Sequence, residues 1–149
     1  MTEPEISSPI MKDGKQLVFS PSRYEPQMGY SRGIRVGNQI FVAGTTAIDA
    51  NGRACAEDVG AQTDYVIRKI QATLRQLGGE LHHVVSTVTH LSDLSYFDDY
   101  ALMFQKYFGD ITPVNTTVQA PLLRPELLVE ITATAVLVQS TDSTSSSTS

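Results

Sequence analysis

Only two segments of the chain, residues 58–77 and 96–108, carry the apolar period of an amphipathic helix, and this limits the possible folds. The apolar residues are Ile67, Ile70, Leu74 and Leu77 in the first segment, and Phe97, Tyr100, Phe104 and Phe108 in the second. Two such helices cover only one face of a sheet. The pattern therefore predicts an α+β domain with a single sheet and two helices on one face.

The strand candidates are short segments rich in β-branched and aromatic residues and bounded by turn residues. They are residues 16–20, 30–36, 39–43, 83–91, 114–120 and 127–138. Gly37 and Asn38 separate two of them with a tight-hairpin signal. The predicted chain order is three strands, a helix, a strand, a helix and two strands.

The last strand candidate has two different faces, because successive side chains of a strand point to opposite sides. One face carries Val129, Ile131, Ala133, Ala135 and Leu137, and the other carries Leu128, Glu130, Thr132, Thr134 and Val136. The first face is apolar, and the second is mixed and has no helix to cover it. A mixed face of this kind suits packing between subunits, so we expect a closed oligomer.

The composition is that of one globular domain, with 41% hydrophobic and 18% charged residues in 149. We expect a flexible arm at residues 1–14, the folded domain at 15–139 and a disordered Ser/Thr-rich tail at 140–149. No apolar run is long enough to span a membrane, and the N-terminal residues lack the features of a signal peptide. A cytoplasmic protein without a membrane partner is expected.

The sequence lacks the common motifs of catalysis and metal binding. It has no Gly-rich phosphate loop, no nucleophile elbow and no Cys/His cluster, and Cys55 is the single cysteine. The histidines, His82, His83 and His90, are interpreted as exposed or hydrogen-bonded, so no metal and no cofactor are expected. The net charge of −5, without a basic cluster, opposes binding to nucleic acid.

Glu130 is the residue that most suggests chemistry, because a carboxylate between Val129 and Ile131 in a strand is costly to desolvate. One interpretation is an exposed or ion-paired residue of the mixed face. The other is a carboxylate in a cleft, where it handles protons or holds a water molecule. The pattern leaves both open.

Four sequence blocks occur in a characteristic order and spacing. They are GYSRGIRVGNQIFVAGT at 29–45, LGG at 77–79, VVSTVTHLSDLSYF at 84–97 and LLVEITATAV at 127–136. Together they resemble the reactive intermediate deaminases, the RidA or YjgF-like family, over residues 27–138. The resemblance implies a chorismate-mutase-like α+β fold and a homotrimer with clefts at the subunit interfaces.

Active members of that family hydrolyse imines and enamines to a 2-keto acid and ammonia, without metal or cofactor. The resemblance assigns Tyr30 and Glu130 to the pair that assists water, and Gly44 to the glycine that lines the cleft. The implied partner is a small-molecule substrate.

Three pocket positions depart from the family pattern. Asn115 stands where the family has its carboxylate-binding Arg, Thr117 replaces a Cys, and Ala101 replaces a frequent Asn of the second helix. An amide cannot make the bidentate, charged clamp of a guanidinium on a carboxylate. The change therefore disfavours ordinary 2-imino acids, and Asn115 and Thr117 favour a neutral polar ligand. Arg124 is either a solvated loop residue or a replacement cation.

The resemblance and its departures leave two hypotheses. The first is a RidA-like enzyme that acts on an imine, an enamine or a related activated double bond, by hydrolytic deamination or by proton-transfer isomerisation, with a non-standard substrate. The second is a non-catalytic ligand-binding or regulatory trimer that has lost deaminase activity.

Overall fold

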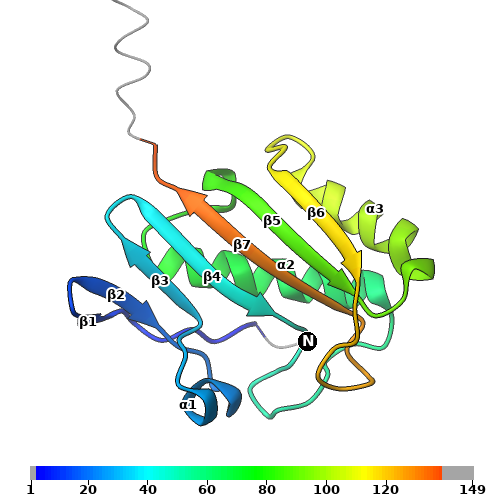
Figure 1. Cartoon of the computed structure of the whole chain (residues 1–149), viewed down its shortest axis with the longest axis horizontal. Coiled ribbons are helices and arrows are strands. Elements are labelled where there is room, and N and C mark those ends of the chain that lie inside the picture. The colour runs from blue at the N-terminus through cyan, green and yellow to red at the C-terminus, as the bar shows by residue number, and fades with distance from the viewer. Residues whose placement is uncertain (1–2, 139–149) are drawn as a thin grey trace, which may run out of the picture.

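One mixed sheet of seven strands forms the centre of the computed structural model, which describes residues 3–138 (Figure 1). The strands are β1 (Ile10–Lys12), β2 (Lys15–Val18), β3 (Gly33–Val36), β4 (Gln39–Thr45), β5 (Val84–Leu91), β6 (Val114–Gln119) and β7 (Val129–Val136). The helices are α1 (Tyr24–Met28), α2 (Val59–Gln76) and α3 (Phe97–Phe108), with short 3-10 turns η1 (Leu81–His83) and η2 (Leu94–Tyr96). The tail predicted at residues 140–149 lies outside the described residues.

The strand order is β1-β2-β3-β4-β7-β5-β6, so the last strand of the chain lies in the middle of the sheet. All neighbouring strands are antiparallel except β5 and β6, which run parallel because α3 crosses between them. Residues of β7 therefore meet β4 on one side and β5 on the other.

The apolar face of β7 packs against the two long helices. Val129, Ile131, Ala133 and Ala135 are at most 1% exposed and join one core with residues of α2 and α3. Figure 1 shows α2 and α3 on the same side of the sheet, behind the strands. The structure confirms the predicted α+β architecture with two helices on one face.

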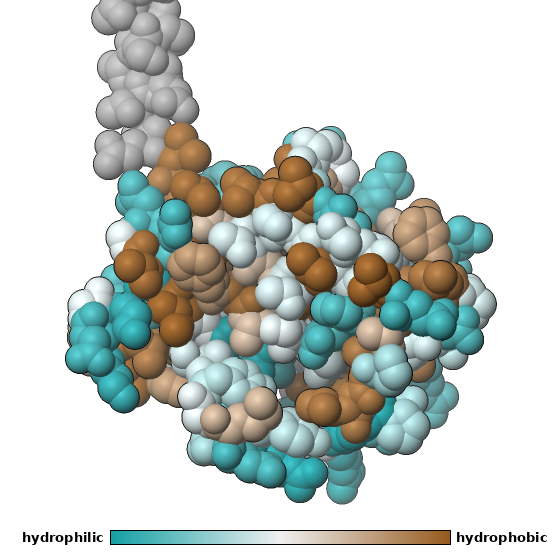
Figure 2. Space-filling view, in the orientation of Figure 1, coloured by the Kyte–Doolittle hydropathy of each residue, from teal (hydrophilic) through white to brown (hydrophobic). Residues whose placement is uncertain are grey.

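The opposite face of the sheet is open and mixed in character. Phe41 of β4 pairs with Thr134 of β7 on this face, and its side chain is 43% exposed. On β6, Val118 pairs with His90 and is 41% exposed. Figure 2 shows apolar and polar side chains intermingled on this side of the molecule.

The N-terminal part of the domain differs from the prediction in two places. Residues 10–12, which fall inside the predicted flexible arm, form β1 and pair with β2. The predicted strand at residues 30–36 begins only at Gly33, because the short helix α1 precedes it and ends at Gly29 in a left-handed conformation (φ 82°).

None of the helices in residues 3–138 is long and apolar enough to cross a membrane.

Candidate active site

Three residues that the resemblance singled out meet in one cleft at the end of β4. Tyr30 comes from the segment after α1, Gly44 from β4 and Glu130 from β7, and all three line the same cavity of about 40 Å³. Glu130 faces the cleft because Val129 and Ile131, its neighbours in the strand, turn toward the helices. The strand alternation thus places the carboxylate on the open side of the sheet.

Gly44 provides the space that the Glu130 carboxylate occupies. A Cβ atom at position 44 would lie 2.9 Å from Cδ of Glu130 and 3.0 Å from its Oε2, which is closer than such contacts allow. The β4–β7 pairing shifts register between Val42 and Thr45, so β4 bulges at this point. A side chain at position 44 would push the carboxylate away, which explains why this position carries glycine.

His90 is a neighbour of Glu130 that the sequence analysis did not connect with the site. The two residues pair across β5 and β7, and Nδ1 of His90 lies 3.6 Å from Oε1 of Glu130. Within residues 3–138 this Nδ1 is buried and has no hydrogen-bond partner. A protonated His90 would form an ion pair with the carboxylate. Only the strand register reveals this pairing, because β5 and β7 are far apart in the sequence.

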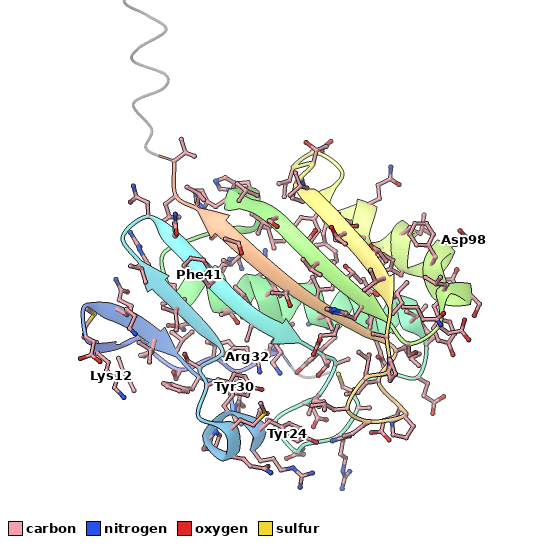
Figure 3. The ribbon with its side chains drawn as sticks, viewed as in Figure 1. Lys12, Tyr24, Tyr30, Arg32, Phe41 and Asp98 are labelled. Atoms are coloured by element: carbon pink, nitrogen blue, oxygen red, sulfur yellow. The ribbon has the colours of Figure 1, made fainter. Side chains whose placement is uncertain are left out.

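Arg32 holds residues of the cleft in place through hydrogen bonds. Its side chain is buried, and its Nη1 donates to the Gly44 carbonyl oxygen at 2.7 Å and to Oγ1 of Thr45 at 3.3 Å. Its Nη2 donates to the Tyr30 hydroxyl at 3.2 Å, and its Nε donates to Oε2 of Glu25 at 3.0 Å. Figure 3 shows Arg32 next to Tyr30, between α1 and the sheet. One guanidinium therefore positions both the tyrosine and the backbone of the glycine.

Glu25 is the buried counter-charge of Arg32. It is 1% exposed, and besides the Arg32 bond its carboxylate accepts from the backbone N–H of Ser20 at 2.8 Å and from the Ser20 hydroxyl. The bonds satisfy a carboxylate that would otherwise be costly to bury. The sequence analysis singled out neither residue: Glu25 lies outside the predicted elements, and Arg32 is an ordinary member of the strand candidate at residues 30–36.

Asn115 and Thr117 do not reach this cleft within one chain. In the parallel β5–β6 register they pair with Thr87 and Thr89, whose side chains are buried toward the helices. Nδ2 of Asn115 donates to Oγ1 of Thr87 at 3.0 Å, and Oγ1 of Thr117 donates to Oδ1 of Asn115 at 2.7 Å. Glu130, in contrast, pairs with His90 on the opposite face. The structure thus separates the predicted residues into two groups.

Asn115 and Thr117 are connected to the core by a series of hydroxyl groups. The Tyr100 hydroxyl of α3 lies 2.6 Å from Oγ1 of Thr89 and 3.3 Å from Oγ1 of Thr117. Ala101, also in α3, packs against the core. A polar chain therefore runs from the exposed strand β6 to the buried side of the sheet.

Arg124 has local partners. Its Nε forms an ion pair with Glu126, and its Nη1 donates to the Gly52 carbonyl oxygen at 2.8 Å. It lines a groove with Tyr24 and Ile48, which also border the Glu130 cleft. The side chain is thus held beside the cleft and does not line it.

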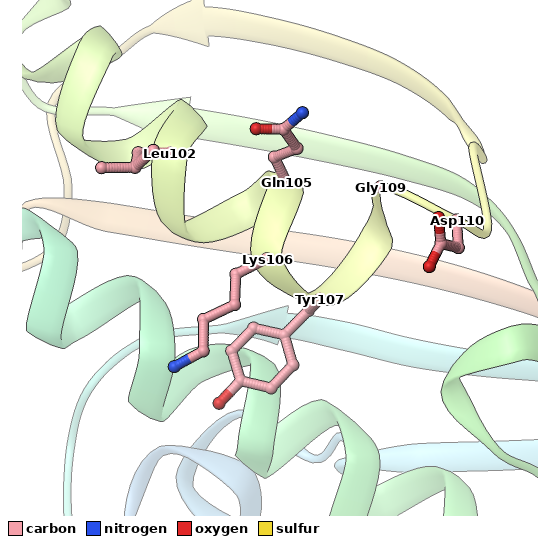
Figure 4. Close-up of a pocket in the computed structure, with 6 residues that line it drawn as sticks. All are labelled: Leu102, Gln105, Lys106, Tyr107, Gly109 and Asp110. Atoms are coloured by element: carbon pink, nitrogen blue, oxygen red, sulfur yellow. The ribbon is translucent and has the colours of Figure 1, made fainter.

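A larger surface hollow lies at the C-terminal end of α3 (Figure 4). It is lined by Leu102, Gln105, Lys106, Tyr107, Gly109 and Asp110. It contains none of the residues that the sequence analysis singled out, so the cleft at Glu130 is the stronger candidate. Among residues 3–138 there is also no group of three or more His, Cys, Asp or Glu side chains placed to hold a metal ion.

A single α+β sheet backed by two main helices, with a glutamate–tyrosine cleft at the end of β4, has the chorismate-mutase-like architecture. The chain belongs to the family described as Endoribonuclease L-PSP, which matches residues 20–137. A RutC family protein of Pyrococcus abyssi is 35% identical over 122 residues, covering 81% of this chain and 96% of the relative.

Two further relatives support the same assignment. The structure of a YjgF family member from Mycobacterium tuberculosis superposes with a TM-score of 0.76 and 36% identity, over 83% of this chain and 99% of that one. The chloroplastic Reactive Intermediate Deaminase A of Arabidopsis thaliana is 30% identical over 125 residues, covering 83% of this chain and 67% of the relative. The resemblance to the RidA and YjgF-like proteins is confirmed.

Proposed function

We propose that this protein is an enzyme that acts on imines, enamines or related activated double bonds of small molecules. The reaction is hydrolytic deamination or a proton-transfer isomerisation. The observation that carries the proposal is the Glu130 carboxylate, held against Gly44 in a cleft that also contains the Tyr30 hydroxyl. Family membership and the name of the Arabidopsis relative support this reaction class.

In the hydrolytic reaction Glu130 acts as the general base. It accepts a proton from a water molecule while the water oxygen bonds to the imine carbon and the C=N electron pair moves to nitrogen, and the carboxyl group then gives this proton to the nitrogen. In the resulting carbinolamine the carboxylate removes the hydroxyl proton and passes it to the amine, so that the carbonyl forms, the C–N bond breaks and ammonia leaves. The same carboxylate can move a proton between carbon and nitrogen, which is the isomerisation alternative.

Tyr30 is suited to act as a hydrogen-bond donor in these steps. Its hydroxyl oxygen accepts from Nη2 of Arg32, so the hydroxyl hydrogen stays free to point to a substrate. A donor fixed in advance stabilises charge that develops on the nitrogen or oxygen of the reacting group.

The proposal includes a homotrimer whose subunit interfaces complete the clefts. The mixed open face of the sheet and the exposed strand β6 supply surfaces for such contacts. Asn115 and Thr117, which lie away from their own Glu130, would then meet the cleft of a neighbouring copy. The expected particle mass is three times the chain mass of 16.2 kDa. The expected cytoplasmic location belongs to the same proposal.

Cleavage of RNA, which the family description suggests, is not proposed for this chain. Its net charge of −5 opposes the attraction of a phosphate backbone. Activity on a defined RNA that falls steeply with salt would revive that function.

The test is to generate imines freshly and measure ammonia and carbonyl release with and without the protein, corrected for spontaneous hydrolysis. One substrate carries a carboxylate and one is neutral, and both are tested with wild type, Glu130→Gln and the surface control Glu126→Gln. We expect wild type and the control to accelerate at least one substrate, and Glu130→Gln to lose at least about a hundredfold in rate. Light scattering should show the same particle mass for all three.

Full activity of Glu130→Gln would remove Glu130 from the mechanism. Tight binding of the substrates by wild type, without product, would instead support the non-catalytic ligand-binding trimer, for which the replacements at Asn115, Thr117 and Ala101 are the argument.

A further inference from the structure

His90 lies on the open face of the sheet, beside the Glu130 carboxylate. Its strand neighbours Thr89 and Leu91 are buried toward the helices, so the side chain of His90 points to the opposite side. Figure 1 shows β5 between β7 and β6, and in the register of these strands His90 lies between Glu130 and Val118. His90 is therefore on the side of the sheet where Glu130 is proposed to act.

The two ring nitrogens of His90 have different surroundings. Nδ1 is buried, has no hydrogen-bond partner within residues 3–138 and lies 3.6 Å from Oε1 of Glu130. The side chain as a whole is 33% exposed, so the edge of the ring with Nε2 faces solvent. In the described part of the chain, His90 is the only basic residue within ion-pairing distance of the Glu130 carboxylate. The carboxylate oxygen is thus the acceptor that the structure offers to Nδ1.

The carboxylate determines which nitrogen of neutral His90 carries the proton. A neutral imidazole has one N–H donor and one acceptor nitrogen. An acceptor at Nδ1 would bring two lone pairs together in a buried place, whereas an N–H there points a donor at the carboxylate. At 3.6 Å the contact is slightly longer than a hydrogen bond, and catalytic hydrogen bonds often tighten only when a substrate is bound. We therefore expect the proton on Nδ1 and the lone pair on Nε2.

We infer that His90 is a positioning residue for Glu130: its neutral ring donates from Nδ1 to Oε1 and leaves Oε2 to take up the proton of the attacking water. The inference rests on the proposed function of the cleft and adds a control of its activity by pH. When Nε2 also takes up a proton, the ring becomes a cation beside the carboxylate. The positive charge stabilises the charged form of Glu130 and makes it a weaker base. Neutral His90 thus supports turnover, and protonated His90 suppresses it.

His90 is the group in this region that is suited to change charge near neutral pH. Of its two flanking strands, β7 contributes Glu130 and β6 carries no titratable residue. The other charged or titratable groups of the cleft and of the loop between β6 and β7 are Tyr24, Tyr30, Arg32, Lys69, Arg124 and Glu126. Burial lowers the pKa of Lys69 to about 8, so this amine loses its proton on the alkaline side. Tyrosine and arginine change charge above the range of pH 5 to 8 and carboxylates below it, which leaves the imidazole.

The test measures kcat and KM between pH 5 and pH 8 for two freshly generated imines, 2-iminobutanoate and its neutral amide, with the full chain. The proteins are wild type, His90→Asn, His90→Leu and the control His82→Asn, which changes an exposed histidine of η1. Asparagine keeps an N–H near the place of Nδ1 but cannot take up a proton, and leucine has neither property. Light scattering should show the same particle mass for all four.

The two variants at position 90 should differ from wild type in different ways. At pH 8 we expect His90→Leu to lose about tenfold in kcat with little change in KM, because His90 acts on the carboxylate and not on the substrate. His90→Asn should recover most of this loss. The ratio of the wild-type rate to the His90→Asn rate should fall at least about threefold from pH 8 to pH 5, because only wild type acquires the positive charge. The ratio also cancels the pH dependence of the imine itself, and His82→Asn should follow wild type.

Nitrogen NMR supplies a second readout that needs no substrate. The chain has three histidines, so labelling with ¹⁵N-histidine gives few signals, and His90→Asn identifies those of His90. Above pH 8 the ¹⁵N shifts of His90 should place its proton on Nδ1.

A proton on Nε2 would overturn the inference, as would a His90→Leu variant with the kcat and pH profile of wild type. An equal loss of rate toward acid in wild type and His90→Asn would also overturn it. Any of these results, with imine turnover intact, would leave the proposed function standing and remove only the role of His90. Absence of imine turnover in wild type would overturn both.

Discussion

The buried ion pair between Glu25 and Arg32 should be the most stability-sensitive polar contact near the cleft. The Glu25→Ala variant leaves the Arg32 guanidinium buried, with Arg32 only 4% exposed, and without its counter-charge. It also removes the acceptor of the Ser20 N–H. Breaking a buried pair from one side costs roughly 3–5 kcal/mol of unfolding free energy. Alanine has the higher helix propensity, so helix propensity does not contribute to the loss.

The loss should appear in urea and thermal unfolding at one fixed protein concentration, since subunit association shifts apparent stability. For a chain of this size the expected cost corresponds to a decrease in Tm of roughly 6–20 °C. The double variant Glu25→Met/Arg32→Met removes both charges, and it should cost clearly less than the sum of the two single variants. Imine turnover should fall in all three, because replacing Arg32 removes the hydrogen-bond partner of Tyr30, and replacing Glu25 removes the carboxylate that holds Arg32 in place.

The matched control is Glu126→Ala, which breaks the exposed ion pair with Arg124. Such a pair contributes at most about 1 kcal/mol. If Glu25→Ala proved no less stable than Glu126→Ala, or if the double variant cost the full sum, the assigned role of the buried pair would be wrong.

Three further outcomes are expected. Gly44→Ala should displace the Glu130 carboxylate and reduce imine turnover by about ten- to a hundredfold. The free energy of unfolding in urea should fall by less than about 1 kcal/mol, because the new methyl group meets only the end of a flexible side chain. Unchanged turnover would contradict this account of the glycine. Tyr100→Phe should leave the buried Thr89 hydroxyl without its 2.6 Å partner and cost roughly 1–3 kcal/mol in the same assay, and an unchanged urea midpoint would refute that. Burial lowers the pKa of Lys69 from 10.5 to about 8 in the folded chain. Between these two pH values the unfolded chain binds more protons than the folded chain, so this residue makes the free energy of unfolding rise with pH. Lys69→Met should therefore be more stable than wild type, most of all below pH 8, and the difference should shrink toward pH 10.5. A difference that stayed constant with pH would contradict the burial of a charged amine.

Periodicity along the chain was sufficient to predict the main architecture. A helical spacing or a strand alternation is defined by residues that lie within a few positions of one another. The patterns of α2, α3 and β7 can therefore be recognised in the sequence without knowledge of distant contacts. The same alternation placed Glu130 on the open side of the sheet, opposite Val129 and Ile131. The short helix α1 was not predicted, because five residues are too few to show a period.

The composition of the cleft depends on contacts between distant segments. Arg32 reaches Glu25 and Tyr30 because α1 folds back on β3, and His90 meets Glu130 because β7 enters the sheet beside β5. Lys69 belongs to the cleft because α2 packs against the end of β4. The free energy of a buried charge depends on the groups that surround it in space. Long-range packing and strand register determine which groups these are. The local pattern could thus indicate the carboxylate, but the cations around it became visible only in the folded chain.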